Sequence, residues 1–330
     1  RATVKAIDQA GIRPAVRDRR VGDYILGPLL GEGDGWQDFA AKHASLGVAR
    51  RVRVYPFARA ASPEERERLA RMATREFRVL EGIDHPGILR VLDFRDSEFG
   101  PALVFEHDSS AVRLDRFLRE KLTEVTAEGR LGLLRQLAEA LGYAHGKRLY
   151  HRGLAPQNVL VRSAGDAMPR LQIMNWQVAT RAEGSQTAFP VTSGTRNLDD
   201  HFADPAKVYL APEALGGGEA GAQADVFSLG AIAYHLFAGR PPATSHLEMP
   251  AKLRETGGLR LSEAVDGVGT YLEDLVRTST APVIRDRIAS AGEFLEYLSL
   301  AETDARPQET TANVDPSLAK RDDRLDGGFV

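Results

Sequence analysis

The order of apolar and polar residues divides the chain into a strand-rich first third and a helix-rich remainder. Val52 and Val54 alternate with larger polar or aromatic neighbours, which is the two-residue period of a strand. Similar apolar segments predict strands over residues 24–30, 39–44, 51–57, 88–94, 102–106, 159–162 and 171–175. Apolar residues at helical spacing predict helices over 62–82, 126–147, 224–238, 270–278 and 290–300. Strands followed by helices indicate an α+β fold with two lobes.

Composition excludes several kinds of function. The chain has 43 basic and 46 acidic residues, a net charge of −3, so no charge excess favours nucleic acid or an anionic membrane. It has no cysteine, which excludes disulfides, a thiol nucleophile and cysteine-ligated metal sites. The best candidate for a membrane span, residues 229–238, is shorter than the ~18–20 residues required. We therefore predict a cytoplasmic protein that binds neither nucleic acid nor membrane.

The two ends of the chain differ from its centre. Residues 1–20 are basic and weakly patterned, which predicts a linker or solvated arm. Residues 303–323 are polar and contain two prolines, which predicts a second linker. Residues 324–330 echo residues 20–25, so we expect a second domain of the same kind to begin there. Because the chain opens with Arg1, we expect it to be part of a longer protein.

A glycine-rich segment, Leu30-Gly31-Glu32-Gly33, follows the first long predicted strand. Such a segment can hold a phosphate on its backbone N–H groups, or it can be a plain hairpin turn. Further motifs follow in order: Asp84-His85-Pro86, Tyr150-His151-Arg152, Ala211-Pro212-Glu213 and Asp225-Val226-Phe227-Ser228-Leu229-Gly230. In this order and spacing, residues 21–300 resemble the eukaryotic-like Ser/Thr protein kinases.

This resemblance implies a bilobal protein-kinase-like fold. A small β-rich N-lobe is expected over residues 21–106 and a larger helical C-lobe over residues 107–302. The resemblance also assigns structural roles at six positions that match the family's fold-holding residues. These are Leu80, His151 and Trp176 in the spine between the lobes, Asp225 under the catalytic loop, and Glu213 paired with Arg287 or else Arg285.

The catalytic positions implied by the resemblance have changed. Phosphoryl transfer in the family needs a strand lysine paired with a helix glutamate, a catalytic aspartate, and an aspartate and an asparagine that hold magnesium. The glutamate and the asparagine remain as Glu76 and Asn158. The strand lysine, the catalytic aspartate, the next lysine and the metal-binding aspartate fall on Tyr55, Gly153, Ala155 and Asn175. We therefore predict that this domain is not an enzyme but a pseudokinase without catalytic or metal-binding residues.

The implied nucleotide site has changed as well. Gly31 and Gly33 remain, but the third glycine of the loop falls on Trp36, and Phe105 narrows the rear of the pocket. The two apolar residues that pack on adenine fall on Asp38 and Arg53. We therefore expect no cofactor and no binding of ATP or magnesium.

The changed residues can also contact one another. Opposite charges buried together should pair, so we predict an ion pair between Asp38 and Arg53 in the adenine slot. Tyr55 lies two residues further along the same strand face, so we predict that its hydroxyl donates to Glu76.

Three functions remain open. The first is a regulatory domain inside a longer chain, with an adjacent kinase domain and other proteins of the same system as partners. Segments 32–36, 81–86 and 173–176 resemble the PglW-type kinases of actinobacteria, which implies a role in phage growth limitation or BREX defence. The second is an unorthodox active Ser/Thr kinase, for which Arg53 and Asp38 are the candidate cation and base. The third is a stand-alone docking module.

Overall fold

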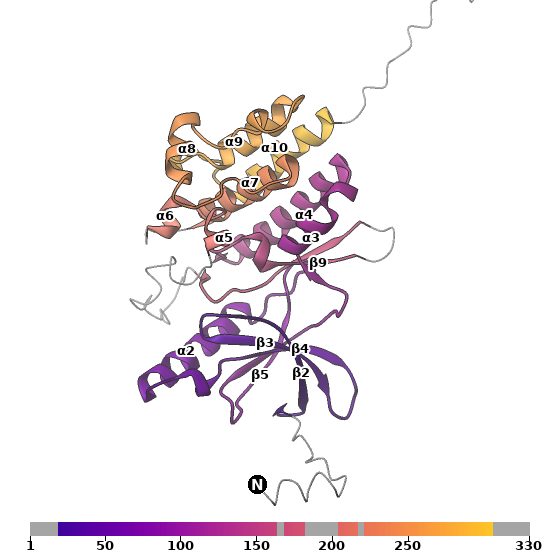
Figure 1. The fold of residues 1–330 in the computed structure, drawn as a ribbon, viewed down its shortest axis with the longest axis vertical. Coiled ribbons are helices and arrows are strands. Elements are labelled where there is room, and N and C mark those ends of the chain that lie inside the picture. The colour runs from indigo at the N-terminus through magenta and orange to yellow at the C-terminus, as the bar shows by residue number, and fades with distance from the viewer. Residues whose placement is uncertain (1–18, 164–167, 182–203, 217–220, 306–330) are drawn as a thin grey trace, which may run out of the picture.

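The computed structural model describes residues 19–163, 168–181, 204–216 and 221–305. These residues form two lobes, one built on a sheet and one built from helices (Figure 1). The predicted α+β fold with two lobes is confirmed. The predicted segment 324–330 and most of the predicted arm (1–20) and linker (303–323) lie outside the described residues.

The N-lobe is a six-stranded antiparallel sheet in the order β1-β2-β3-β4-β6-β5, with helix α2 beside it (Figure 1). In chain order its elements are β1 (Arg20–Val21), β2 (Tyr24–Gly33), β3 (Trp36–His43), β4 (Ala49–Val54), η1 (Phe57–Arg59), α2 (Pro63–Leu80), β5 (Val91–Arg95) and β6 (Ala102–Phe105).

The start of α2 follows from its sequence. The Ser62 hydroxyl caps the helix by accepting from the backbone N–H of Glu65 at 3.3 Å, and Pro63 occupies the first turn. The buried face of α2 contains Leu69, Ala73 and Leu80, spaced as one side of a helix. Glu76 lies on this same face, so the helix carries a carboxylate inward.

The C-lobe is mainly helical, with short strands facing the N-lobe. Its elements are β7 (Val112–Arg113), α3 (Leu114–Lys121), η2 (Leu122–Glu124), α4 (Ala127–Gly146), β8 (Leu149–Tyr150), η3 (Pro156–Asn158), β9 (Val159–Arg162), β10 (Arg170–Ile173), β11 (Thr180–Arg181), α5 (Asp204–Lys207), α6 (Pro212–Leu215), α7 (Ala222–Ala238), α8 (Met249–Thr256), η6 (Leu261–Glu263), α9 (Thr270–Ser279), η7 (Ile284–Asp286) and α10 (Ala291–Asp304). Helix α7 is buried from Ala224 to Leu236, so it forms the centre of this lobe.

Several element boundaries differ from the predictions, and β3 begins at Trp36 rather than at residue 39. The strand predicted to reach residue 57 ends at Val54, although Tyr55 and Phe57 still donate to the carbonyls of Pro101 and Phe99 at 2.9 and 2.8 Å. The strand predicted from Ile88 begins at Val91, and Ile88 instead makes an isolated bridge to Ile173. Helices α3 and α8 were not predicted, since each is only eight residues long. Short helices give weak periodic signals.

An ion pair fixes the end of the C-lobe. The Arg287 guanidinium donates to both carboxylate oxygens of Glu213 at 2.6 and 3.2 Å and to the carbonyls of Gln223 and Ala281. The predicted partner of Glu213 is therefore Arg287. The alternative, Arg285, has a side chain that is 85% exposed and lies beside Asp286.

We expect the Arg287→Met variant to lose about 3 kcal/mol of unfolding free energy, because Glu213 and two carbonyls lose a buried cationic donor. Arg285→Met is the matched control and should stay within about 0.5 kcal/mol of the parent. Urea unfolding followed by circular dichroism measures both values. Equal losses in the two variants would contradict the structural role of Arg287.

Candidate functional site

The cleft between the lobes brings together most of the positions that the sequence singled out. The N-lobe contributes the β2–β3 hairpin, β4, α2 and β6. The C-lobe contributes the loop after β8 and the loop after β10. The side chains that meet there are Trp36, Asp38, Arg51, Arg53, Tyr55, Glu76, Phe105, Asn158 and Asn175.

Arg53 and Asp38 form the predicted ion pair. They face each other on the antiparallel strands β4 and β3. Arg53 Nε donates to Asp38 Oδ1 at 2.7 Å and Nη2 donates to Oδ2 at 2.9 Å, which is the two-pronged geometry of a guanidinium on a carboxylate. Both residues are only 1% exposed. The pair is therefore held away from water.

Glu76 has two partners from strand β4 and the residue that follows it. Arg53 Nη1 donates to Glu76 Oε1 at 2.7 Å, and the Tyr55 hydroxyl donates to Oε2. The predicted bond from Tyr55 is confirmed. The bond from Arg53 was not predicted, although Tyr55 stands where the family's lysine would be. Arg53 therefore supplies the cation that pairs with the helix glutamate.

Arg51 is a member of the cluster that the sequence analysis missed. It lies on the same strand face as Arg53, two residues earlier, and its Nη1 donates to Asp38 at 2.9 Å. The two-residue period of β4 was the signal that could have identified it. With Arg51 included, two carboxylates and two guanidinium groups meet in the buried cluster, so its formal charges cancel.

Two aromatic rings lie against the Arg53 guanidinium. Its carbon lies 4.1 Å from the Trp36 ring centroid and 5.6 Å from the Phe105 ring centroid. Both are cation–π distances. Trp36 replaces the third glycine of the loop, and its side chain occupies the space that a Cβ on Gly33 would need. The ring of Trp36 therefore covers the ion pair, and Phe105 lies close to it.

The glycine-rich segment is a hairpin packed against α2. Gly35, at the tip, has a φ of +75°, and a Cβ added there would lie 2.7 Å from Leu69. Glu32 pairs with Arg59 at 2.7 Å, and Asp34 lies 3.7 Å from Arg68. The segment is therefore a hairpin between β2 and β3, a geometry that both interpretations of this segment share.

The pKa values of the cluster reflect competition between burial and charge. For Asp38, burial raises the pKa, but the charges and hydrogen bonds of Arg53 and Arg51 outweigh it, so the pKa is lowered. For Glu76, burial is the stronger effect and the pKa is raised despite Arg53 and Tyr55. Burial, together with the Glu76 carboxylate, raises the pKa of Tyr55 well above 10.0. Tyr55 is therefore a neutral hydroxyl donor at physiological pH.

The C-lobe side of the cleft is held by asparagine amides. Asn175 Nδ2 donates to Asn158 Oδ1 at 2.7 Å, and Asn158 Nδ2 donates to the Gly153 carbonyl at 2.6 Å. Asn175 Oδ1 accepts from Arg53 at 2.5 Å. Gly153, at the position of the family's catalytic aspartate, has no side chain, and Ala155 is buried.

The loop that carries Gly153 is anchored by Asp225. This buried carboxylate accepts from the backbone N–H groups of His151 and Arg152 at 2.8 and 2.7 Å and from His145 at 2.9 Å. The His151 ring packs edge-on against Trp176 with centroids 4.6 Å apart. The structure therefore places His151, Trp176 and Asp225 in the structural positions predicted for them.

At the family's metal-binding positions the cleft presents two asparagine amides. Magnesium prefers carboxylate oxygens and water, but Asn158 and Asn175 bring amides that already bond to each other. Within the described ranges, no group of three or more histidine, aspartate or glutamate side chains is arranged to hold a metal. Nor does any helix there have the length and apolar character to cross a membrane.

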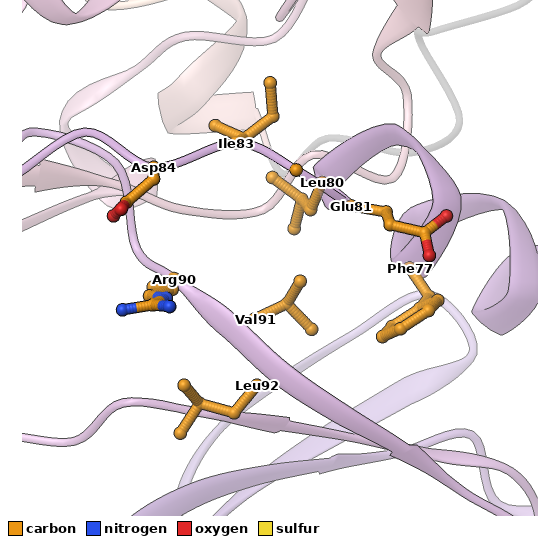
Figure 2. A pocket seen from close by; sticks show the side chains of 9 residues that line it. Phe77, Leu80, Glu81, Ile83, Asp84, Arg90, Val91 and Leu92 are labelled. Atoms are coloured by element: carbon orange, nitrogen blue, oxygen red, sulfur yellow. The ribbon is translucent and has the colours of Figure 1, made fainter.

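Two hollows on the described surface lie away from this cleft. One, of about 240 Å³, lies between the end of α2 and β5, where Phe77, Leu80, Ile83 and Val91 border it (Figure 2). The other, of about 440 Å³, lies in the C-lobe between Val208, Tyr234 and the prolines at 241 and 242. Neither is bordered by a member of the Arg53 cluster.

Comparison with known proteins agrees with the motifs. The family model described as "Protein kinase domain" matches residues 29–294. The chain belongs to the protein kinase family. "Probable kinase PglW" of Streptomyces coelicolor is 35% identical over 324 residues, which cover 92% of this chain and 21% of that protein. "Serine/threonine-protein kinase ATG1a" of Arabidopsis thaliana is 30% identical over 70% of this chain and 34% of its own length. The chain thus spans about a fifth of the length of the first relative and about a third of the length of the second.

The kinase fold is also found by structural comparison. The kinase domain of Mycobacterium tuberculosis PknI aligns with a TM-score of 0.61 and 23% identity, covering 86% of this chain and 98% of that one. The resemblance to PglW-type bacterial kinases that the sequence predicted is confirmed by the 35% identity to PglW. The prediction that the domain is not an enzyme is wrong, because the chain belongs to a phosphotransferase family and its relatives are protein kinases.

We expect Arg53→Met to lower the unfolding free energy by about 3–5 kcal/mol, because Asp38 and Glu76 stay buried without their shared cation. Arg53→Lys should lose less, since it keeps the charge but not the fork. Arg50→Met, three residues earlier and with its guanidinium on an exposed carbonyl, is the control and should lose about 0.5 kcal/mol at most. Thermal and urea unfolding measure these changes, and equal losses at Arg53 and Arg50 would contradict the central role of Arg53.

Proposed function

We propose that this protein kinase domain is a regulatory domain of a longer PglW-like kinase and acts through its contacts with an adjacent kinase domain of the same chain. The resemblance to PglW-type kinases implies a cytoplasmic anti-phage system whose other proteins would be further partners. The observation that carries the proposal is the Arg53 cluster, which fills the slot where the family packs adenine.

Three features support this function. The slot is lined by charges that already satisfy each other, so an entering adenine would leave Asp38 and Arg53 buried and unpaired. The glycine-rich hairpin packs on α2 and carries Trp36 over Arg53. Glu76 is held inward by the chain's own Arg53 and Tyr55. The proposal therefore includes that ATP and magnesium do not enter the cleft while the Arg53 cluster is assembled.

A second candidate is phosphoryl transfer by this domain, and kinship with protein kinases favours it. Arg53 would then be the cation at the phosphates and Asp38 the base. Because these two side chains bind each other in the cleft, this function requires their ion pair to open first. Phosphate transfer from labelled MgATP by this chain, lost in Asp38→Asn, would favour the second candidate over the first.

Nucleotide binding tests the proposal. We expect no change in melting temperature of this chain at millimolar MgATP. We expect a shift of roughly 2 °C or more in a variant that combines Asp38→Val, Arg53→Ala, Tyr55→Lys and Asn175→Asp, since a ligand at 100 times its Kd adds about 2.7 kcal/mol. A magnesium-dependent shift in the parent chain would contradict the proposal.

The regulatory role is tested in the longer protein that contains this chain. Because Arg53 holds hairpin, strand and helix together, Arg53→Met should change the phosphorylation rate of the whole protein, whereas Arg50→Met should leave it unchanged. The rate with a generic substrate and labelled ATP measures this. Equal rates in both variants and the parent would contradict regulation through this domain.

A further inference from the structure

We propose that Asn175 is a positioning residue that clamps the two lobes together, using the family's metal-binding positions as a hydrogen-bond relay. The inference deepens the proposed function and rests on it in one respect, namely that the cleft is occupied by the chain's own side chains. It concerns what Asn175 and Asn158 do in place of holding magnesium.

The relay crosses the cleft in one direction. Arg53 Nη2, on strand β4 of the N-lobe, donates to Asn175 Oδ1 at 2.5 Å. Asn175 Nδ2 then donates to Asn158 Oδ1 at 2.7 Å, and Asn158 Nδ2 donates to the Gly153 carbonyl at 2.6 Å. Both side-chain amides thus use their oxygen as acceptor and their nitrogen as donor. The N-lobe ion pair is therefore connected directly to the loop that carries Gly153.

An asparagine is needed at position 175 for this relay. An aspartate could accept from Arg53, but it has no N–H for Asn158 when ionised. Asn158 would then have to turn its own N–H away from Gly153. Asn175 also has a φ of +65°, a left-handed conformation that asparagine tolerates better than most residues. The change from a metal-binding aspartate to asparagine thus replaces one function with another.

Other contacts also join the lobes, among them the backbone hydrogen bonds of Ile173 with Gly87 and Leu89 at 2.8 and 2.9 Å. Arg51 Nη1 lies 3.5 Å from the Met174 sulfur, and Arg75 donates to the Ala179 carbonyl at 2.9 Å. Gln177, with its amide oxygen turned toward the guanidinium, accepts from Arg53 and donates to the Asn175 carbonyl at 3.1 Å. Arg53 thus contacts the C-lobe at Asn175 and at Gln177. Of these two residues, Asn175 is the one that is hydrogen-bonded onward to the Gly153 loop through Asn158.

The clamp can be measured because the chain has no cysteine. Leu46 in the N-lobe and Leu247 in the C-lobe are 72% and 77% exposed, so Leu46→Cys and Leu247→Cys give two spin-label sites on opposite lobes. Pulsed electron–electron double resonance then measures the distance between the two spin labels, with no nucleotide or metal added. We expect one narrow distance distribution for the parent pair.

Asn175→Gly removes the clamp while keeping the left-handed backbone. We expect the population of longer distances to rise about tenfold, the effect of losing one charge-assisted hydrogen bond. Asn175→Asp loses the N–H for Asn158 but keeps an acceptor for Arg53, which is the bond that joins the lobes, so it should keep the narrow distribution. The control is Gln136→Ala, because Gln136 also uses both amide ends, toward Leu171 and Pro169, but entirely within the C-lobe. It should leave the distances unchanged.

Either of two results would overturn the clamp. One is an unchanged distribution in Asn175→Gly with a native circular dichroism spectrum. The other is the same broadening in Asn175→Asp as in Asn175→Gly, which would mean that the bond to Arg53 does not hold the lobes. Neither result depends on ATP, so failure of the clamp is distinguishable from failure of the proposed regulatory function, which the nucleotide and whole-protein measurements test.

Discussion

A guanidinium that has left water needs a paired charge and hydrogen-bond partners, and the way Arg53 meets this need organises the cleft. Arg53 bonds Asp38, Glu76 and Asn175, which come from a strand, a helix and the opposite lobe. Removing a charge from water costs several kcal/mol unless it is paired and hydrogen-bonded. The positions of the hairpin, of α2 and of the loop after β10 are therefore coupled through one side chain.

The same requirement explains why the helix glutamate remains inward although its usual lysine partner is absent. Arg53 reaches Glu76 from two residues earlier on the strand, and Tyr55 contributes a neutral donor. Trp36 takes the space opened by a neighbouring glycine and covers the ion pair. The changes at Trp36, Asp38, Arg53 and Tyr55 thus fit one another as a group, and each is difficult to explain alone.

Much of this could be predicted from the sequence, because the fold-holding motifs keep their order and spacing. The pairing of Asp38 with Arg53 followed from opposite charges that face the same slot from adjacent strands, and the bond from Tyr55 to Glu76 followed from the position of Tyr55 on the same face as Arg53. The bonds from Arg53 to Glu76 and Asn175 could not be predicted, because they depend on how far a flexible side chain reaches across elements distant in sequence. The changed catalytic residues led to the prediction that the domain is not an enzyme. Its membership of the protein kinase family contradicts that prediction.

The neutral charge of the buried cluster has a consequence for its evolution. Replacing any one of Asp38, Arg53 or Glu76 leaves an unmatched charge in the interior, so each single step back toward an open nucleotide slot passes through a less stable protein. Only concerted replacement of several residues avoids that barrier. Once assembled, the cluster is therefore difficult to lose by single substitutions, and descendants of this domain should retain its charged residues together or lose them together.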